Sequence, residues 1–248
     1  MQLKQLCDFC NEYLKVDDFN DYCPNGLQVE ANPVVEHIVC GVTASQALIE
    51  VAIDAGADTL IVHHGYFWKG ESQSISGIKG RRIASLIRNN INLLAFHLPL
   101  DVHPEVGNNV QLARIMGWKI ERSGGEQGLL FEGHIPQQTS LAELSQQIES
   151  RLNTRALVIS AGDHAIERVA WCTGAAQGFI EAAAAAGVDA FVSGEVSEPT
   201  FHLAQELGVH YIAAGHHATE RYGVQALGLE IARRFAVQQQ FIDIPNPV

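Results

Sequence analysis

Residues 38–65 read IVCGVTASQALIEVAIDAGADTLIVHHG, and residues 169–196 read VAWCTGAAQGFIEAAAAAGVDAFVSGEV. The two stretches align without a gap. The matched residues include Gln46 with Gln177, Ile49 with Ile180, Glu50 with Glu181, Gly56 with Gly187 and Asp58 with Asp189. Each copy predicts an apolar strand, a turn, an alanine-rich helix that ends at a glycine, and a second apolar strand. A repeated strand–helix–strand unit indicates an internal duplication, so we expect an α/β protein of two similar halves.

A second pair of segments extends the match. Residues 92–101, NLLAFHLPLD, align with residues 211–220, YIAAGHHATE, which places His97 on His216 and Asp101 on Glu220. The loop at 65–80 has turn composition and no counterpart, and it accounts for the shorter offset of this second match. A polar, glycine-containing stretch at 121–127 predicts the join, so the expected halves are 1–124 and 125–248, with the candidate site between them.

Alternating apolar strands and helices predict mixed, largely parallel sheets flanked by helices. We expect strands near 37–42, 58–63, 92–97, 129–135, 156–160, 168–172, 189–193, 209–214 and 240–243. We expect helices near 3–15, 45–55, 81–90, 107–116, 140–152, 176–186, 198–207 and 218–236.

Composition narrows the class of protein. The chain has 248 residues, 47% of them hydrophobic, and a formal net charge of −12. The acidic balance argues against a broad nucleic-acid surface, although Lys79, Arg81, Arg82 and Arg88 form a local basic strip. No apolar run is long enough to cross a membrane, and the start of the chain lacks a signal-peptide pattern. Five irregularly spaced cysteines do not suggest disulfides. We expect a soluble cytoplasmic protein.

Histidine and carboxylate side chains gather where three predicted strands end. His63 and His64 close the first strand, His97 and Asp101 follow the second, and His216 and Glu220 follow the third. In α/β sheets, ligand sites lie at the carboxyl ends of strands. The sequence therefore predicts that these side chains share one site.

The donor set favours a pair of divalent metal ions. Imidazole with carboxylate suits Zn, Mn, Ni, Co or Fe. Adjacent residues on a strand point to opposite faces, so His63 and His64 favour two ions over one. Five protein ligands on two ions (His63, His64, Asp101, His216 and Glu220) leave positions for water and substrate, as catalysis requires. His97 is the candidate acid–base group.

Three other segments are less specific. Gly194 and Glu195 occupy the place of His63 and His64 in the second copy, and Glu195 is not expected to face the site. Residues 66–69, Tyr-Phe-Trp-Lys, fit two interpretations, base stacking with a phosphate contact or packing at a subunit interface. Residues 21–26, DYCPNG, predict a turn.

Several of these blocks resemble one known family. DYCPNGLQV (21–29), IVHHGYFWKG (61–70), FHLPLDVHPEVGNN (96–109), VSGEVSE (192–198) and AAGHHATE (213–220) are similar to the GTP cyclohydrolase 1 type 2 homolog family, the NIF3-like proteins. The resemblance implies two similar α/β halves, a di-metal site between them and a ring-shaped homohexamer. It implies the same five metal ligands, and all five are present.

Two function classes follow. The first is a metal-dependent hydrolase that acts on a nucleotide or a related small molecule, by cyclohydrolase or phosphoesterase chemistry. The second is a non-catalytic metal-binding or adaptor protein whose ring-shaped oligomer binds a partner. Ligand positions left open for substrate favour the hydrolase.

Overall fold

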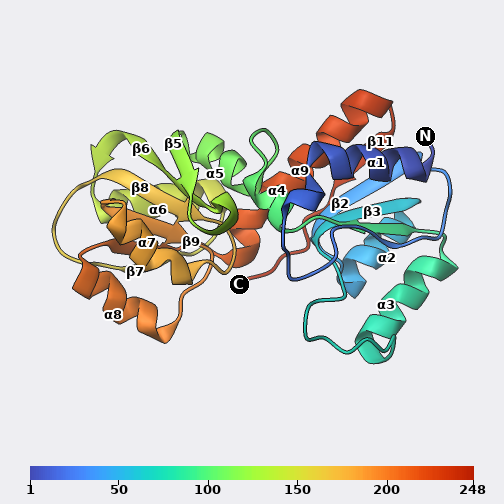
Figure 1. The fold of residues 1–248 in the computed structure, drawn as a ribbon, viewed down its shortest axis with the longest axis horizontal. Coiled ribbons are helices and arrows are strands. Elements are labelled where there is room, and N and C mark those ends of the chain that lie inside the picture. Colours follow the sequence, from blue (N-terminus) through green and yellow to red (C-terminus); the bar gives the residue numbers. More distant parts are fainter. The chain divides into compact units, whose positions relative to one another are not determined.

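The structure is a computed structural model that describes residues 1–248. The chain divides into two compact units, Met1–Gly107 with Gly223–Pro245, and Asn108–Tyr222 with Asn246–Val248 (Figure 1). This division departs from halves at 1–124 and 125–248. Helix α5 (Asn108–Met116) belongs to the second unit, where the Trp171 indole donates to the Asn109 carbonyl oxygen at 3.0 Å. Strand β11 (Gln238–Phe241) pairs in the sheet of the first unit.

The first unit contains a five-stranded sheet. Its strand order is β1 (Gly26–Val29), β4 (Asn92–Ala95), β3 (Thr59–His64), β2 (His37–Thr43) and β11. Only β1 runs antiparallel to its neighbour, and the other pairs are parallel. Parallel pairing brings the carboxyl ends of β2, β3 and β4 to one edge of the sheet.

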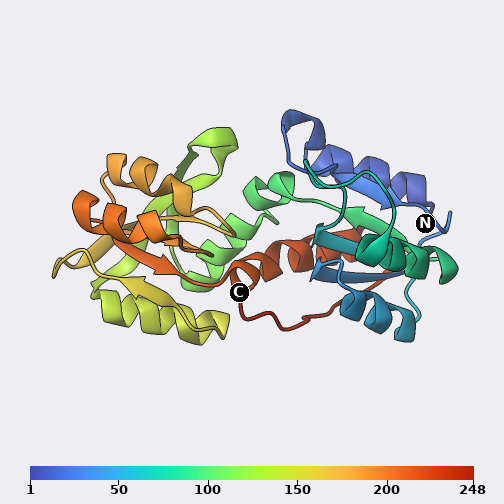
Figure 2. The ribbon, with the colours of Figure 1, turned by 90° about the horizontal axis from the view of Figure 1, so that it is seen from below.

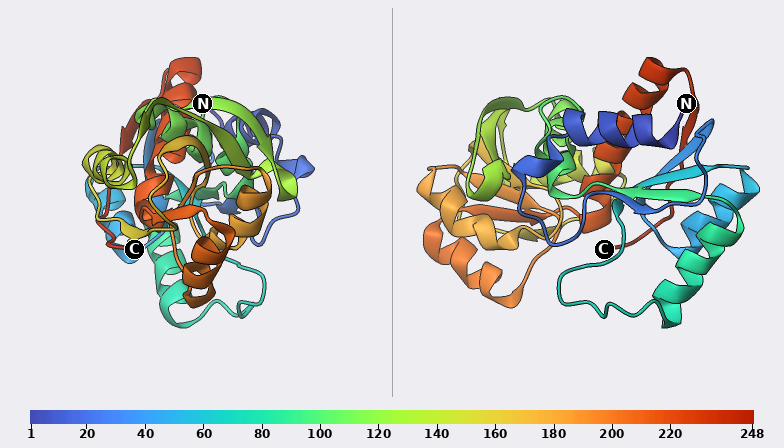
Figure 3. Two further views of the ribbon diagram at one scale, coloured as in Figure 1. Left: turned by 90° about the vertical axis from the view of Figure 1, so that its left-hand side faces the viewer. Right: turned by 45° about the vertical axis from the view of Figure 1, so that its right-hand side comes forward.

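Helices cover both faces of this sheet (Figure 3). Helix α1 (Leu3–Tyr13) and the part of α9 (His216–Phe235) that belongs to this unit pack on the face that carries Ile38. Helices α2 (Gln46–Asp54) and α3 (Gly77–Arg88) pack on the face that carries Val39. Successive residues of a strand face opposite ways, so the unbroken apolar strands of the sequence reflect burial on both sides.

The second unit contains a mixed six-stranded sheet. Its order is β5 (Lys119–Gly124), β6 (Leu130–Thr139), β8 (Ile166–Cys172), β9 (Ala190–Ser193), β10 (His210–Ala213) and β7 (Leu157–Ile159). Strands β8, β9 and β10 are parallel, and the remaining pairs are antiparallel. Helix α6 (Leu141–Leu152) lies on one side, and α7 (Ile180–Ala185) and α8 (Glu198–Leu207) lie on the other (Figure 2).

The repeat in the sequence is visible in the backbone of both units. Asp58 Oδ2 accepts the amides of residues 36 and 37 at 2.7 and 2.8 Å. Asp189 Oδ2 accepts the amides of residues 167 and 168, both at 2.8 Å. Gly56 and Gly187 end the matched helices with φ of 70° and 71°, a conformation that favours glycine. The fold is therefore the mixed α/β architecture with two similar parts that the sequence predicts.

One alignment changes by a residue. Asn92 pairs with Thr59 in the first sheet as His210 pairs with Ala190 in the second. The sequence match placed Asn92 on Tyr211 instead. The structural alignment follows the backbone hydrogen bonds of the strands, which set the register. The sequence alignment was instead fixed by the histidines that follow the strands.

A few elements are not evident from the sequence. These are β1, β5, the short helix α4 (Leu98–Val102) and three 3₁₀ turns, Val16–Asp18, Glu126–Gly128 and Gln177–Phe179. None of the helices is both long and apolar enough to span a membrane.

Candidate metal centre

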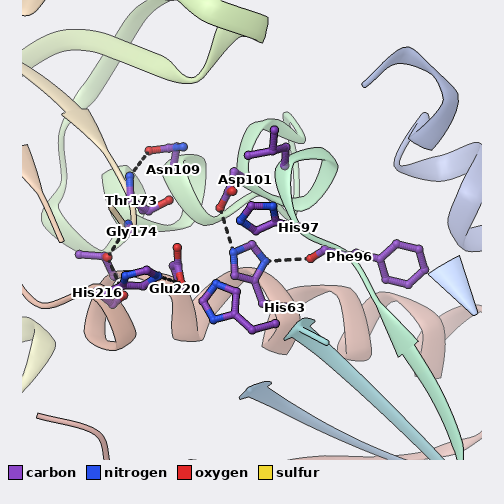
Figure 4. Close-up of polar contacts among 12 residues, drawn as sticks. His63, Phe96, His97, Asp101, Asn109, Thr173, Gly174, His216 and Glu220 are labelled. Atoms are coloured by element: carbon purple, nitrogen blue, oxygen red, sulfur yellow. Dashed lines mark hydrogen bonds and ion pairs between the residues drawn. The ribbon is translucent and has the colours of Figure 1, made fainter. Parts of the chain in front are cut away.

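In the first unit, His63 is held in one orientation at the end of β3. Its side chain is fully buried, and its Nδ1 lies 2.8 Å from the Phe96 carbonyl oxygen. A carbonyl only accepts, so Nδ1 carries the proton and Nε2 presents its lone pair. Asp101 Oδ1 lies 3.5 Å from that Nε2 (Figure 4). A lone pair and a carboxylate oxygen that face each other in a buried place fit a cation between them.

Two further imidazoles join His63 at this edge. The ring centroids of His63 and His64 are 4.6 Å apart, and His97 lies 5.1 Å from His63 and 5.7 Å from His64. One ring nitrogen from each of the three lies within 4.8 Å of the others. Adjacent strand residues were expected to point to opposite faces. The two rings nevertheless lie close together, although His64, the last residue of β3, still pairs with Thr43 of β2.

His97 is oriented by the turn that precedes β1. Its Nδ1 donates to Asp21 Oδ1 at 2.7 Å, and its amide donates to Asn25 Oδ1 at 2.7 Å. Burial raises the pKa of Asp21, but the hydrogen bonds and charge of His97, together with Asn25, outweigh burial and hold the pKa below its ordinary value. With Nδ1 occupied, Nε2 is the nitrogen of His97 that can take up or release a proton.

Asp21 was missed because its segment has ordinary turn composition. No feature of the neighbouring sequence indicates that Asp21 contacts His97, which lies 76 positions later. Asp21, Cys23 and His97 also form a group of potential metal ligands. Burial raises the pKa of the Cys23 thiol to about 12, and a protonated thiol is a poor ligand. The histidines at the end of β3 are the better donors.

In the second unit, the first turn of α9 carries His216 and Glu220. His216 Nε2 lies 3.0 Å from Glu220 Oε2, and His216 Nδ1 lies 2.7 Å from Glu195 Oε1. Burial alone lowers the pKa of His216, but the hydrogen bonds and charges of Glu220 and Glu195 outweigh it and raise the pKa to about 9. Glu195 therefore faces the predicted residues, although the sequence did not favour it. The alignment of Glu195 with His64 in the repeat was the sequence feature that could have predicted this role.

The loop after β8 closes around Glu220. The Gly174 amide donates to Thr219 Oγ1 at 3.1 Å, and the Thr173 amide donates to Asn109 Oδ1 at 3.1 Å (Figure 4). Gly174 has a φ of 69°, and a Cβ built there would collide with Glu220 Oε1. The absence of a side chain at Gly174 thus leaves room for the Glu220 carboxylate.

The profile of the family described as Duf34/NIF3 (NGG1p interacting factor 3) matches residues 1–247. The chain belongs to the DUF34/NIF3 family. The resemblance read from the sequence blocks is confirmed.

Full-length relatives of this DUF34/NIF3 protein carry the name GTP cyclohydrolase 1 type 2 homolog. One from Pseudomonas aeruginosa is 52% identical, with 99% of this chain and 98% of the relative covered. One from Escherichia coli K12 is 50% identical, and both chains are covered completely.

Solved structures show the same fold. Protein ybgI, described as of unknown function, is 49% identical with a TM-score of 0.97 over 100% of both chains. The protein TTHA1606 from Thermus thermophilus is 34% identical with a TM-score of 0.90, again over 100% of both chains.

Two other side chains of this DUF34/NIF3 protein make hydrogen bonds to backbone carbonyls. His103 Nε2 donates to the Tyr13 carbonyl oxygen at 3.0 Å. The Tyr66 hydroxyl is buried and donates to the Ala44 carbonyl oxygen at 2.7 Å. The structure thus brings His63, His64, His97 and Asp101 together in one unit, and His216 and Glu220 together in the other.

Proposed function

We propose that this DUF34/NIF3 protein binds two divalent metal ions and uses them to hydrolyse a nucleotide or a related small molecule. The proposed ligands are His63, His64, Asp101, His216 and Glu220. The supporting observation is the orientation of His63, whose Nε2 lone pair is directed at the Asp101 carboxylate by the Phe96 carbonyl. Only a cation or a proton makes that arrangement favourable in a buried place.

The number of metal-ligand side chains in each unit leads us to propose that both units bind the same pair of ions. The first unit offers two histidines and a carboxylate, and the second offers one of each. A catalytic metal ion commonly takes three protein ligands, so neither set alone suffices for a pair of ions. Asp101 and Glu220 would supply the carboxylate ligands of the pair, and the three histidines would supply the imidazole ligands.

Side chains of the protein itself would transfer protons and orient the ligands. When bound, the metal ions supply Lewis-acid polarisation of substrate oxygen and activation of water. His97 exchanges a proton at Nε2 while Asp21 fixes its tautomer through Nδ1. Glu195 holds the His216 ring by its Nδ1, which aims Nε2 toward Glu220.

The test combines metal content with turnover. Metal-loaded protein is assayed on a panel of nucleotides, and the metal is counted by plasma mass spectrometry. Glu220→Gln should lose metal and turnover together, whereas Glu206→Gln, on the exposed surface of α8, should lose neither. Equal activity in the Glu220→Gln variant would remove the proposed centre from the reaction. Stable metal uptake without turnover on any substrate would favour the metal-binding or adaptor alternative.

Assembly and compartment belong to the same proposal. We propose a toroidal homohexamer in the cytoplasm, as the family resemblance implies. None of the five cysteines forms a disulfide, which suits a reducing compartment. Light scattering coupled to size-exclusion chromatography measures the subunit count, and any mass other than six chains contradicts the hexamer.

A further inference from the structure

The loop that follows β3 adopts a strained conformation around one tryptophan. Phe67 has a φ of 66°, which is unfavourable for a residue with a bulky side chain. Glu71 Oε2 accepts the amides of Phe67 and Trp68 at 3.0 and 3.2 Å, and Lys79 Nζ lies 3.4 Å from the same carboxylate. Such strain persists where the surroundings impose it, and it is concentrated at functional sites.

This conformation directs the Trp68 indole toward the histidines. Its Nε1 donates to the Gly65 carbonyl oxygen at 3.2 Å, which fixes the ring. The ring centroid lies 5.0 Å from His97 at an interplanar angle of 84°, and 5.8 Å from His64 at 59°. Neither contact is a face-to-face stack, and Trp68 is only partly buried. The indole therefore lies close to both histidines but is inclined to their rings.

A tyrosine from the neighbouring loop joins it. The Tyr22 side chain is 56% exposed, and its ring lies 6.4 Å from His97 at an angle of 65°. The Lys69 amide donates to the Tyr22 carbonyl oxygen at 2.6 Å, which ties the two loops together. Two aromatic side chains from separate loops therefore flank the one histidine that Asp21 orients.

We propose that Trp68 and Tyr22 form a stacking site that holds the flat heteroaromatic ring of the substrate beside His97. The proposal rests on the proposed function and names its substrate class as one that carries a planar nitrogen heterocycle. Aromatic faces bind such rings by stacking irrespective of the exact base, and His97 beside them offers its Nε2 to the polar edge of the ring. Lys69, on the same loop, is exposed and can meet an anionic substituent.

Intrinsic fluorescence tests this directly. The other tryptophans, Trp118 and Trp171, are buried at 6% and 0% exposure, so Trp68 is the reporter that a ligand can reach. Guanosine and adenosine are titrated as probes, with ribose 5-phosphate as the probe that lacks a heteroaromatic ring. We expect the nucleosides to quench Trp68 and ribose 5-phosphate to leave it unchanged. Equal quenching by all three, or by none, would overturn the stacking site.

Variants separate stacking from folding and from metal binding. Nucleoside binding is measured by calorimetry, and Trp68→Leu should weaken it about tenfold or more, with partial recovery in Trp68→Phe. Tyr22→Leu should act in the same direction. Phe201→Leu, an exposed aromatic on α8, should have no effect. If Trp68→Leu and Phe201→Leu bind the nucleosides equally well, the stacking site is excluded.

Two controls keep this inference distinct from the proposed function. Metal uptake by Trp68→Leu should match that of the unaltered protein. Nucleoside quenching without metal uptake would support the stacking site and refute the metal centre. Metal uptake without nucleoside quenching would support the metal centre and refute the stacking site. A change of oligomeric state in Trp68→Leu would assign the aromatics to a subunit interface and contradict the stacking site.

Discussion

Gly174 illustrates how a residue without a side chain determines the position of a carboxylate. In Gly174→Ala, the positive φ should cost about 1–2 kcal/mol of stability, and the new methyl group must displace Glu220. We expect metal affinity to fall by about 10–100-fold, measured by isothermal titration calorimetry. Gly208→Ala is the matched control, because Gly208 has a φ of 70° with nothing near its Cβ. Equal metal affinity in the two variants would contradict the role of Gly174.

Asp21 is the residue on which the orientation of His97 depends. Its side chain is 3% exposed, and its carboxylate accepts from His97 Nδ1 and from the Leu98 amide. Asp21→Asn should cost about 1.5–3 kcal/mol at pH 7, the typical value for hydrogen bonds to a charged group. The folded-state pKa of Asp21 is lowered, so its stabilising contribution is present above the unfolded pKa and is lost as the pH falls through the folded value.

Urea denaturation at several pH values measures this. The unaltered protein and Asp21→Asn should converge in stability as the medium becomes strongly acidic. Asp163→Asn, on an exposed loop, serves as the control and should follow the unaltered protein throughout. A constant difference between Asp21→Asn and the unaltered protein at every pH would indicate that the carboxylate charge plays no part.

At the scale of elements, strand β3 shows what the sequence can and cannot predict. Its apolar run, Thr59 to Val62, predicts a buried parallel strand, and the position of His63 and His64 at its end follows from that. The approach of the two rings does not follow, because alternation along a strand predicts that neighbouring side chains point to opposite faces, whereas these two rings lie 4.6 Å apart. Strand β1 was not predicted, because it is four residues long and begins at the glycine that closes the expected turn at 21–26.

Strand β10 begins with a buried histidine whose protonation opposes folding. His210 Nδ1 accepts the Ala161 amide, Nε2 contacts the His164 carbonyl oxygen, and the His164 ring stacks on it at 3.9 Å. Burial lowers the pKa of His210. The unfolded chain then binds more protons, so stability is complete above the unfolded pKa of about 6.5 and decreases as the pH falls below it.

The dependence on His210 is measurable as a slope. Between pH 7.5 and pH 5, the free energy of unfolding of His210→Gln should change less steeply than that of the unaltered protein. His202→Gln, an exposed position on α8, should retain the original slope. If His210→Gln retains it as well, His210 does not contribute to the pH dependence.

For the whole molecule, the repeat in the sequence predicts the architecture but not the course of the chain between the units. Matched residues such as Asp58 and Asp189 make the same hydrogen bonds in the two sheets, which is why the repeat was informative. The placement of α5 and β11 depends on packing partners that are distant in the sequence, and the composition of these segments does not identify the partners. The contact of Asp21 with His97 was likewise not predictable from the composition of its segment. Residues that carry the chemistry are recognisable by type, whereas those that position them are recognisable only in the fold.

Metal binding provides a test at this largest scale. Because the proposed ligands come from both units, metal ions should stabilise both against opening. At a metal concentration of 100 Kd the gain is about 2.7 kcal/mol for each ion bound, which slows hydrogen exchange through global opening about 100-fold per ion. Exchange followed by mass spectrometry should show this slowing in peptides of β2 in the first unit and of β9 in the second. In Glu220→Gln the effect should diminish in both units. Slowing confined to peptides of one unit would show that this unit alone holds the metal, and the shared centre would have to be abandoned.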